Sequence, residues 1–224
     1  MQQYKNLFVI GTSHISIESV TAVKEAILKL KPNIVALELD RKRFNSLMYE
    51  KKEKMHLRDI KTIGLSGFLF NVAGAWVERK LGKLVGVPPG SEMKEATRTA
   101  HKVKADIALV DQDISITLKK LSNRLTLKEK SYFVYELLRC LILRKPDIQF
   151  DLKKVPSQIA IHKMTSHVQK HYPSIYLTLI KERNEYMAKA LYKLMTLNPD
   201  RTILAVVGAG HEREIIQLIK KCRT

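Results

Sequence analysis

Two histidines at opposite ends of the chain share a local context that could support chemistry. His14 closes a Gly-Thr-Ser-His sequence after the apolar run Leu-Phe-Val-Ile, and His211 closes Gly-Ala-Gly-His after Leu-Ala-Val-Val. A short apolar, β-branched run followed by glycine indicates a buried strand that ends in a loop. Each histidine is therefore expected just beyond the carboxyl end of a strand, where open α/β sheets place their sites. Coincidence is the alternative, because random order would give roughly 0.3 Gly-x-x-His matches at this composition.

The chemistry open to these two histidines depends on their charge. Both are expected close to the first turn of a helix, where the helix dipole disfavours imidazolium and favours the neutral ring. A neutral imidazole can bind a metal ion or accept a proton. The structural alternative for each is a histidine that caps a helix or fills the core.

Glu38 is the third candidate, because its strand pattern predicts burial. It lies in the apolar run of residues 33–39, close to the carboxyl end of the expected strand. A buried carboxylate is costly without a cation. Arg41 or Arg43 could supply one in a structural ion pair, and a metal shared with His14 and His211 could do the same. Two histidines and one carboxylate are a common arrangement for a hydrolytic divalent metal.

Further polar candidates lie in the middle of the chain. Glu182, Arg183 and Asn184 are consecutive in an expected helix. Since adjacent helical residues point about 100° apart, only one or two of the three can face the core margin. Surface salt bridging by Glu182 and Arg183 is the alternative.

Three more carboxylates have several interpretations. Glu92 stands in the first turn of an expected helix, where a carboxylate also interacts favourably with the dipole. Asp111 and Asp113 follow an expected strand as ligands, turn formers or helix caps.

The elements that must position these side chains follow a strand, helix, strand, helix order. Buried strands are expected at residues 7–10, 33–39, 105–110 and 202–207. Alternation with helices is typical of a parallel sheet. We therefore predict an α/β (or α+β) fold: a central, mostly parallel sheet built from both chain ends, with a large helical layer or cap inserted in the middle. The chain is expected to be a single domain, 1–224, with the mainly helical insertion within about 56–196.

Composition limits the partners. Lysine and arginine outnumber aspartate and glutamate by 40 to 22, a net charge of +18 that favours acidic partners, anionic lipid or nucleic acid. The basic residues are scattered without interleaved aromatic residues, so no dedicated nucleic-acid binding is expected. Cys140 and Cys222 are too few and too far apart for a zinc knuckle or a disulfide framework, so both are expected to be free thiols.

The sequence also bears on location. The first strand begins without a cleavable apolar segment, which predicts no signal peptide. Residues 62–77 are uncharged, but the stretch is short for a transmembrane helix and contains Asn71 and several glycines. A buried or interfacial helix is expected there, in a protein of the cytoplasm or the cytoplasmic side of a membrane.

Six ordered segments together resemble the TraB/PrgY/GumN family, which is related to the TIKI metalloproteases. They cover nearly the whole chain: residues 11–14, 35–41, 89–93, 111–118, 182–187 and 206–211. The resemblance departs at two positions. Gln112 stands where the family pattern has arginine, and Asn184 stands where it has aspartate after Glu-Arg.

The resemblance implies a metal-dependent peptidase-like fold that acts on peptides, because PrgY-type members reduce the activity of peptide pheromones. Manganese or cobalt is favoured, and zinc is chemically acceptable. The residues carried over to the site are His14, Glu38 and His211 as metal ligands, Glu182 as general base or further ligand, Arg183 as oxyanion stabiliser, and Glu92.

Three functions follow from these observations. The first is a metal-dependent peptidase that acts on or down-regulates peptide signals. The second is a non-catalytic module that binds or sequesters peptides in the same pocket. The third is binding of anionic lipid, such as a membrane surface, or of nucleic acid through the basic surface. The oligomeric state stays open, a homodimer included.

Overall fold

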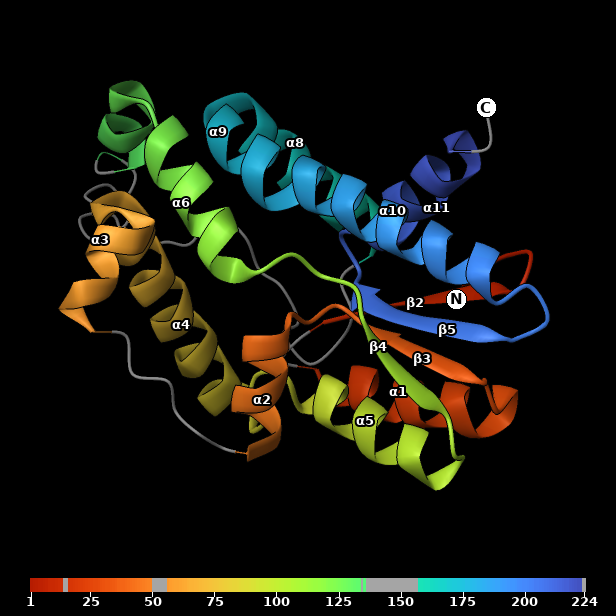
Figure 1. Ribbon diagram of the computed structural model, residues 1–224. Helices are drawn as coiled ribbons and strands as arrows, with labels where there is room; N and C mark the ends of the chain where they lie inside the picture. Colours follow the sequence, from red (N-terminus) through yellow and green to blue (C-terminus); the bar gives the residue numbers. More distant parts are fainter. Residues whose placement is uncertain (14–15, 50–55, 134, 136–156, 223–224) are drawn as a thin grey trace.

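The centre of the protein is a five-stranded sheet. A computed structural model describes residues 1–13, 16–49, 56–133, 135 and 157–222 (Figure 1). The strand order is β1-β2-β5-β3-β4. The strand bounds are β1 (Gln2–Tyr4), β2 (Leu7–Thr12), β3 (Ile34–Leu37), β4 (Asp106–Leu109) and β5 (Ile203–Gly208).

The sheet is built from both ends of the chain, as the sequence predicts. Strand β5 pairs in parallel with β2 on one side and with β3 on the other, and β4 continues the parallel order. Only the edge strand β1 is antiparallel within the described sheet. Every residue of β5 is buried, because this central strand is covered on both faces. The predicted α/β class with a mostly parallel sheet is confirmed.

Helices cover both faces of the sheet. Helices α1 (Ile17–Leu30) and α5 (Ser91–Lys102) pack on one face, and α10 (Glu182–Leu197) and α11 (Glu212–Lys221) pack on the other (Figure 1). A cluster of buried apolar side chains lies on each face of the sheet. The helices contribute Val23, Ile27 and Met93 to the cluster under α1 and α5, and Met187, Leu191 and Ile215 to the cluster under α10 and α11. The sheet is therefore the middle of three layers.

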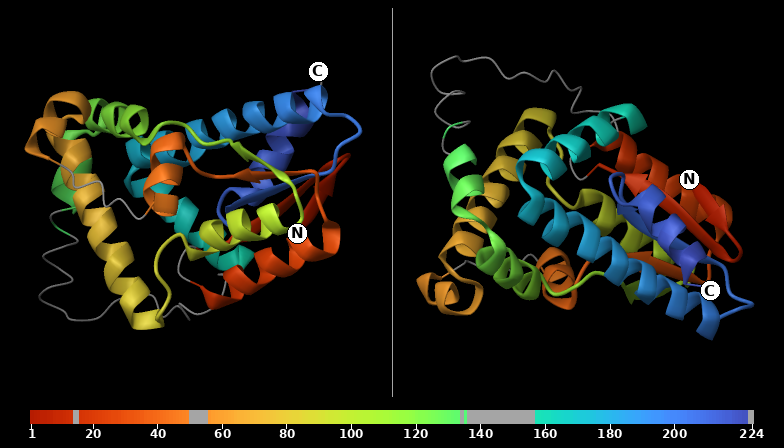
Figure 2. Two further views of the ribbon diagram at one scale, coloured as in Figure 1. Left: turned by 60° about the horizontal axis from the view of Figure 1, so that its bottom comes forward. Right: turned by 90° about the horizontal axis from the view of Figure 1, so that it is seen from above.

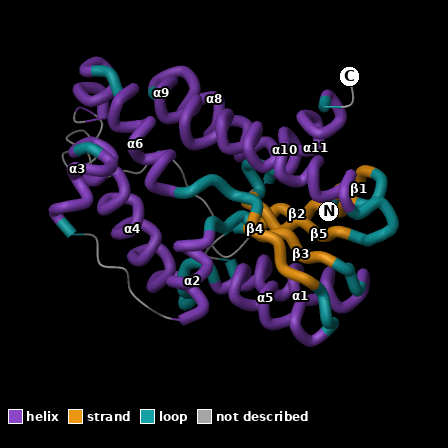
Figure 3. Tube along the Cα trace, in the orientation of Figure 1, coloured by secondary structure: helices purple, strands orange, loops and turns teal. Residues whose placement is uncertain are grey.

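The remaining described helices lie mainly beyond one end of the sheet (Figures 2 and 3). Helices α4 and α6 pack against each other, α3 packs against both, and α8 contacts α9 and η2. Their bounds are α2 (Arg41–Tyr49), η1 (Leu57–Asp59), α3 (Ile60–Ile63), α4 (Leu65–Val85), α6 (Ile114–Arg124), α8 (Gln158–His171), α9 (Pro173–Ile175) and the π-helical η2 (Tyr176–Lys181). The middle of the chain is mainly helical, and it also supplies β4 to the sheet. The boundaries of a helical insertion stay a prediction.

Cys222 is an exposed free thiol, as predicted. Cys140 lies outside the described residues.

Two glycines on the same side of α4, seven residues apart, have different surroundings. A Cβ atom at Gly67 would lie 2.5 Å from the carbonyl oxygen of Leu118 on α6. A Cβ at Gly74 would meet no atom of the described residues within 4 Å. Glycine at position 67 therefore allows α4 and α6 to pack closely.

This contrast predicts opposite effects of the same substitution. Gly67→Ala should lower the free energy of unfolding by about 1–3 kcal/mol, because backbone must move to admit the methyl group. Gly74→Ala should raise it by about 0.5–1 kcal/mol, because alanine is the better helix former. Urea denaturation followed by circular dichroism measures both. Equal effects of the two substitutions would contradict the close α4–α6 contact.

Candidate functional site

The two Gly-x-x-His motifs meet at the carboxyl edge of the sheet. Thr12 in β2 is in register with Gly208 in β5. The Ala209 N–H donates to the carbonyl oxygen of Thr12 at 2.8 Å, and the Thr12 hydroxyl donates to the carbonyl of Val207 at 3.1 Å. His211 is the residue just before α11, close to the start of a helix as its sequence context predicts, but its side chain makes no capping hydrogen bond. His14 lies outside the described residues.

The first glycine of the motif lies against a buried carboxylate. A Cβ atom at Gly11 would lie 2.5 Å from the Glu212 Oε2 atom. Burial raises the pKa of Glu212, and the N-terminal amine and the Gly11 backbone offset part of this rise. The residue after His211 therefore packs directly against the start of the other motif.

Glu38 is buried, with only 3% of its surface exposed, and both carboxylate oxygens accept hydrogen bonds. Oε2 accepts from the Gly208 N–H at 2.6 Å, and Oε1 accepts from the Arg183 guanidinium at 2.6 Å. The cation that Glu38 requires is therefore Arg183. Arg43, one of the two arginines expected from the sequence, donates instead to the Glu38 backbone carbonyl at 3.2 Å.

Arg183 joins two carboxylates from neighbouring strands. Besides Glu38 after β3, it contacts Asp111 after β4 through two bonds: Nε to Oδ1 at 3.1 Å and a terminal nitrogen to Oδ2 at 2.6 Å. Burial disfavours the charged guanidinium, but Glu38 and Asp111 outweigh burial and raise the pKa of Arg183 above its usual value. Arg183 is therefore a permanent cation at the site.

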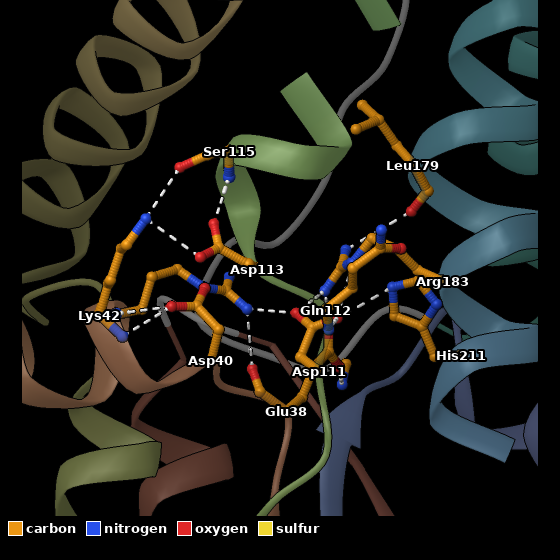
Figure 4. Close-up of polar contacts among 12 residues, drawn as sticks. Glu38, Asp40, Lys42, Asp111, Gln112, Asp113, Ser115, Leu179, Arg183 and His211 are labelled. Atoms are coloured by element: carbon orange, nitrogen blue, oxygen red, sulfur yellow. Dashed lines mark hydrogen bonds and ion pairs between the residues drawn. The ribbon is translucent and has the colours of Figure 1, made fainter. Parts of the chain in front are cut away.

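A second arginine completes a charged cluster. Arg43 donates to Asp40 Oδ2 at 2.9 Å and also pairs with Asp111. Figure 4 shows Glu38, Asp40, Asp111 and Arg183 gathered at this point. The cluster of Glu38, Asp40, Asp111, Arg43 and Arg183 then has three carboxylates and two guanidiniums. With all five groups ionised, it carries one net negative charge, which favours a further cation or proton nearby.

His211 lies beside this negative charge. Its Nε2 atom is 3.5 Å from Glu38 Oε1, and its Nδ1 atom is hydrogen bonded to Asn184 Oδ1. Asn184 donates its amide N–H to Glu214 Oε2 at 2.8 Å. A carboxylate only accepts, so the Asn184 oxygen must face the ring and Nδ1 must carry the hydrogen. Nε2 is therefore the ring atom that faces Glu38.

The position of Glu182 differs from that of its neighbours Arg183 and Asn184. Its carboxylate pairs with Lys120 at 2.8 Å and with Arg124, both on α6. Burial raises the pKa of Glu182, but Lys120 and Arg124 outweigh burial and lower the pKa overall. The part of the chain that the structure describes shows no polar contact from Glu182 to Glu38 or His211. Its role as general base stays a prediction.

Three other candidate residues are placed as follows. Glu92 is buried in the first turn of α5, a helix on the opposite face of the sheet from α10. Asp113 caps α6, because its Oδ1 accepts from the Ser115 N–H at 2.7 Å, and it pairs with Lys42 at 3.0 Å. The backbone N–H of Gln112 donates to Asp111 Oδ1 at 2.8 Å. Asp113 is thus a helix cap, one of the three interpretations its position left open.

Asp111, Asp40 and Arg43 belong to the cluster, although the sequence did not single out Asp40 and left Asp111 ambiguous. A signal was available for both acids. Each follows the carboxyl end of a parallel strand, β3 or β4, at the edge where Glu38 lies. No local pattern indicates that Arg43 would approach Asp111, which is 68 positions away.

The donors fit a divalent cation in part. Among the described residues no group of three histidine, cysteine, aspartate or glutamate side chains could hold a metal ion. Glu38 and His211 offer two donor atoms 3.5 Å apart, a separation that two ligands of one ion can have at bond lengths of about 2.1 Å. The Asn184 contact to Nδ1 is the outer hydrogen bond typical of a metal-binding histidine.

Comparison with known proteins gives a match to one family and several relatives over most of this chain. A sequence model described as the TraB/PrgY/gumN family matches residues 2–223. An uncharacterised protein of Methanocaldococcus jannaschii is 35% identical over 219 residues, which cover 96% of this chain and 54% of the relative. A TraB domain-containing protein of Bos taurus is 25% identical over 231 residues, 92% of this chain and 60% of the relative. The human protein of the same name is 24% identical over 230 residues, with the same coverage of both chains. The chain thus spans about half to three-fifths of the length of these relatives.

The Arg183 contacts predict a large cost of removing the guanidinium. Arg183→Gln should lower the free energy of unfolding by about 3–5 kcal/mol, because Glu38 and Asp111 stay buried without it. Arg124→Gln is the control and should cost less than about 1 kcal/mol, because its ion pair with Glu182 is near the surface and Lys120 remains. Urea denaturation compares the two variants. Equal losses would contradict a special role of Arg183 in the cluster.

The Asn184–Glu214 contact predicts control of the His211 tautomer. Glu214→Ala should reduce the share of the Nδ1–H form, because nothing then holds the Asn184 oxygen toward the ring. Nitrogen-15 NMR of the ring measures the tautomer, with His211→Ala to assign the signal. Glu25→Ala, on an exposed face of α1, should leave the spectrum unchanged. An unchanged tautomer in Glu214→Ala would show that Glu214 does not orient Asn184.

Proposed function

We propose, for a chain that belongs to the TraB/PrgY/gumN family, that the centre formed by Glu38 and His211 binds a divalent metal and hydrolyses peptides. The observation that carries the proposal is the charge around the His211 ring. Its Nε2 atom faces a carboxylate of a cluster with one net negative charge. A lone pair facing that carboxylate is unfavourable unless a cation or a proton lies between them.

The proposed metal ligands are His14, Glu38 and His211, with manganese or cobalt favoured and zinc acceptable. A bound divalent ion would lower the pKa of a water molecule and polarise the carbonyl group of the substrate. The residues of the chain would prepare the site for this chemistry. Asn184 keeps the hydrogen on Nδ1, and the Gly208 N–H holds one oxygen of Glu38 in place.

Arg183 is suited to both positioning and charge stabilisation. Four of its five N–H groups are engaged by Glu38, Asp111 and the carbonyl of Leu179. These contacts orient the Glu38 carboxylate. One terminal N–H is left for the oxyanion of a tetrahedral intermediate.

Glu182 fits the role of proton acceptor less well than that of an ion-pair partner. Its pKa is lowered by Lys120 and Arg124, and a carboxylate that holds two cations is a weak base. Acting as general base would require Glu182 to leave both α6 cations. Glu182 and Glu92 remain proposed catalytic residues, and the experiment below tests Glu182.

An open cavity beside the cluster supports a polar, extended substrate. It measures about 710 Å³ and includes Asp40 and Asp111 of the cluster in its wall. The other lining residues are Arg41, Lys42, Asn45, Ile107, Leu109 and Asp113. Charges of both signs next to apolar side chains suit the backbone and side chains of a peptide.

One observation favours a second candidate function, the binding of peptides without cleavage. Both oxygens of Glu38 already accept hydrogen bonds, from Arg183 and from the Gly208 N–H. A carboxylate engaged in this way is a weaker metal ligand. The same cavity could then hold a peptide that is never cut.

Cleavage of a peptide library separates the two functions. The intact protein with manganese or cobalt should produce fragments that mass spectrometry identifies, and His211→Ala should lose both the fragments and the bound metal. His14→Ala should behave in the same way, and Glu182→Gln tests the proposed base. His101→Ala, an exposed histidine on α5, is the control and should keep full activity.

Two results would overturn the peptidase proposal. Peptide binding without any fragment would favour sequestration. Undiminished cleavage by His211→Ala, with its metal lost, would exclude a catalytic metal at this centre.

A further inference from the structure

Helix α4 carries an exposed apolar stripe outside the candidate site. Four large side chains recur at helical spacing with high exposed fractions. They are Leu65 (58%), Leu69 (57%), Val72 (42%) and Trp76 (56%). Spacings of four, three and four residues place all four on one face of the helix. Such a contiguous apolar face at the surface marks an interaction site.

The other side of α4 explains why this face is exposed. Gly67 lies against the backbone of Leu118 on α6, so the packed side of the helix is the glycine side. The stripe lies on the opposite side of the helix. Figures 1 and 2 show α4 at the periphery of the molecule, away from the sheet.

The charges near the stripe favour an anionic partner. No charged residue occurs between Thr62 and Val77, whereas Arg58 and Lys61 are exposed just before α4. The whole chain carries a net charge of +18. Exposed apolar side chains beside basic residues on a strongly positive chain favour contact with an anionic lipid surface.

We propose that the α4 stripe docks the protein on an anionic lipid bilayer. The helix would lie in the plane of the interface, with Leu69 and Trp76 inserted among the lipids and the basic residues at the headgroups. Among the described helices none is both long and apolar enough to cross a membrane. A second copy of the chain is the weaker candidate for this face, because two chains of charge +18 repel each other, whereas anionic lipid attracts both.

Docking would also orient the candidate site. The carboxyl ends of the parallel strands point toward the end of the molecule where α3, α4 and α6 lie (Figure 1). A bilayer against α4 would therefore lie on the same side of the molecule as the site edge. This inference is independent of the proposed peptidase activity.

Trp76 makes the proposal directly measurable, because it is the only tryptophan in the chain. The full chain is mixed with vesicles of phosphatidylcholine, with and without phosphatidylglycerol, while tryptophan fluorescence and co-flotation are recorded. Anionic vesicles should shift the emission to the blue and carry the protein upward. Neutral vesicles should do neither, and high salt should weaken the binding.

Matched variants test whether the stripe is the contact. Leu69→Glu should weaken binding to anionic vesicles by at least about tenfold, because it loses apolar burial and adds a negative charge. Leu197→Glu makes the same change at a leucine that is 68% exposed at the end of α10, and it should bind as the unchanged protein does. Circular dichroism verifies that both variants fold.

Three results would overturn the proposal. The first is no emission shift and no flotation with anionic vesicles. The second is an equal loss in Leu69→Glu and Leu197→Glu. The third is an emission shift that grows with protein concentration without lipid, which would assign the stripe to a second copy.

Discussion

The buried guanidinium of Arg183 is the constraint on which the site depends. A cation in the interior must be paired, and its two partners come from two different strands, Glu38 after β3 and Asp111 after β4. Because Arg183 belongs to α10, these contacts fix the helix against the carboxyl edge of the sheet. Arg43 extends the same network to α2 through Asp40 and Asp111. Fold and site are therefore held by the same charges.

The phase of α10 decides which neighbours of Arg183 join the site. The π-helical turn η2 ends immediately before Glu182, and its wider turn sets the direction in which α10 begins. Glu182 then points to Lys120 and Arg124 on α6, whereas Arg183 reaches the sheet. Asn184 faces His211 and Glu214. Three consecutive residues thus serve three different partners, as steps of about 100° per residue require.

The sequence predicted the sheet well, because its signals are local. Apolar runs of β-branched residues identify the parallel strands, and burial of Glu38 follows from its place after one of them. Strand β4 was also predicted to be buried, but as an edge strand it is only partly so. It did not identify the partner of Glu38. Arg41 and Arg43 were expected because they are near in sequence, but Arg183 is 145 positions away. Helical periodicity also left open whether Glu182 or Arg183 faces the sheet, since that depends on the packing of η2 and α10.

At both departures from the family pattern, Gln112 and Asn184, neighbouring charged side chains make contacts in place of the missing charge. Gln112 provides no cation, yet Asp111 contacts two guanidiniums, those of Arg43 and Arg183. Asn184 provides no carboxylate. Its amide N–H donates to Glu214, however, and this contact turns its oxygen toward the His211 ring. A neutral amide fixes the tautomer as an aspartate would, but it leaves the negative charge one residue further from the ring. Because Nδ1 holds the hydrogen, the Nε2 lone pair is the one that a cation could use.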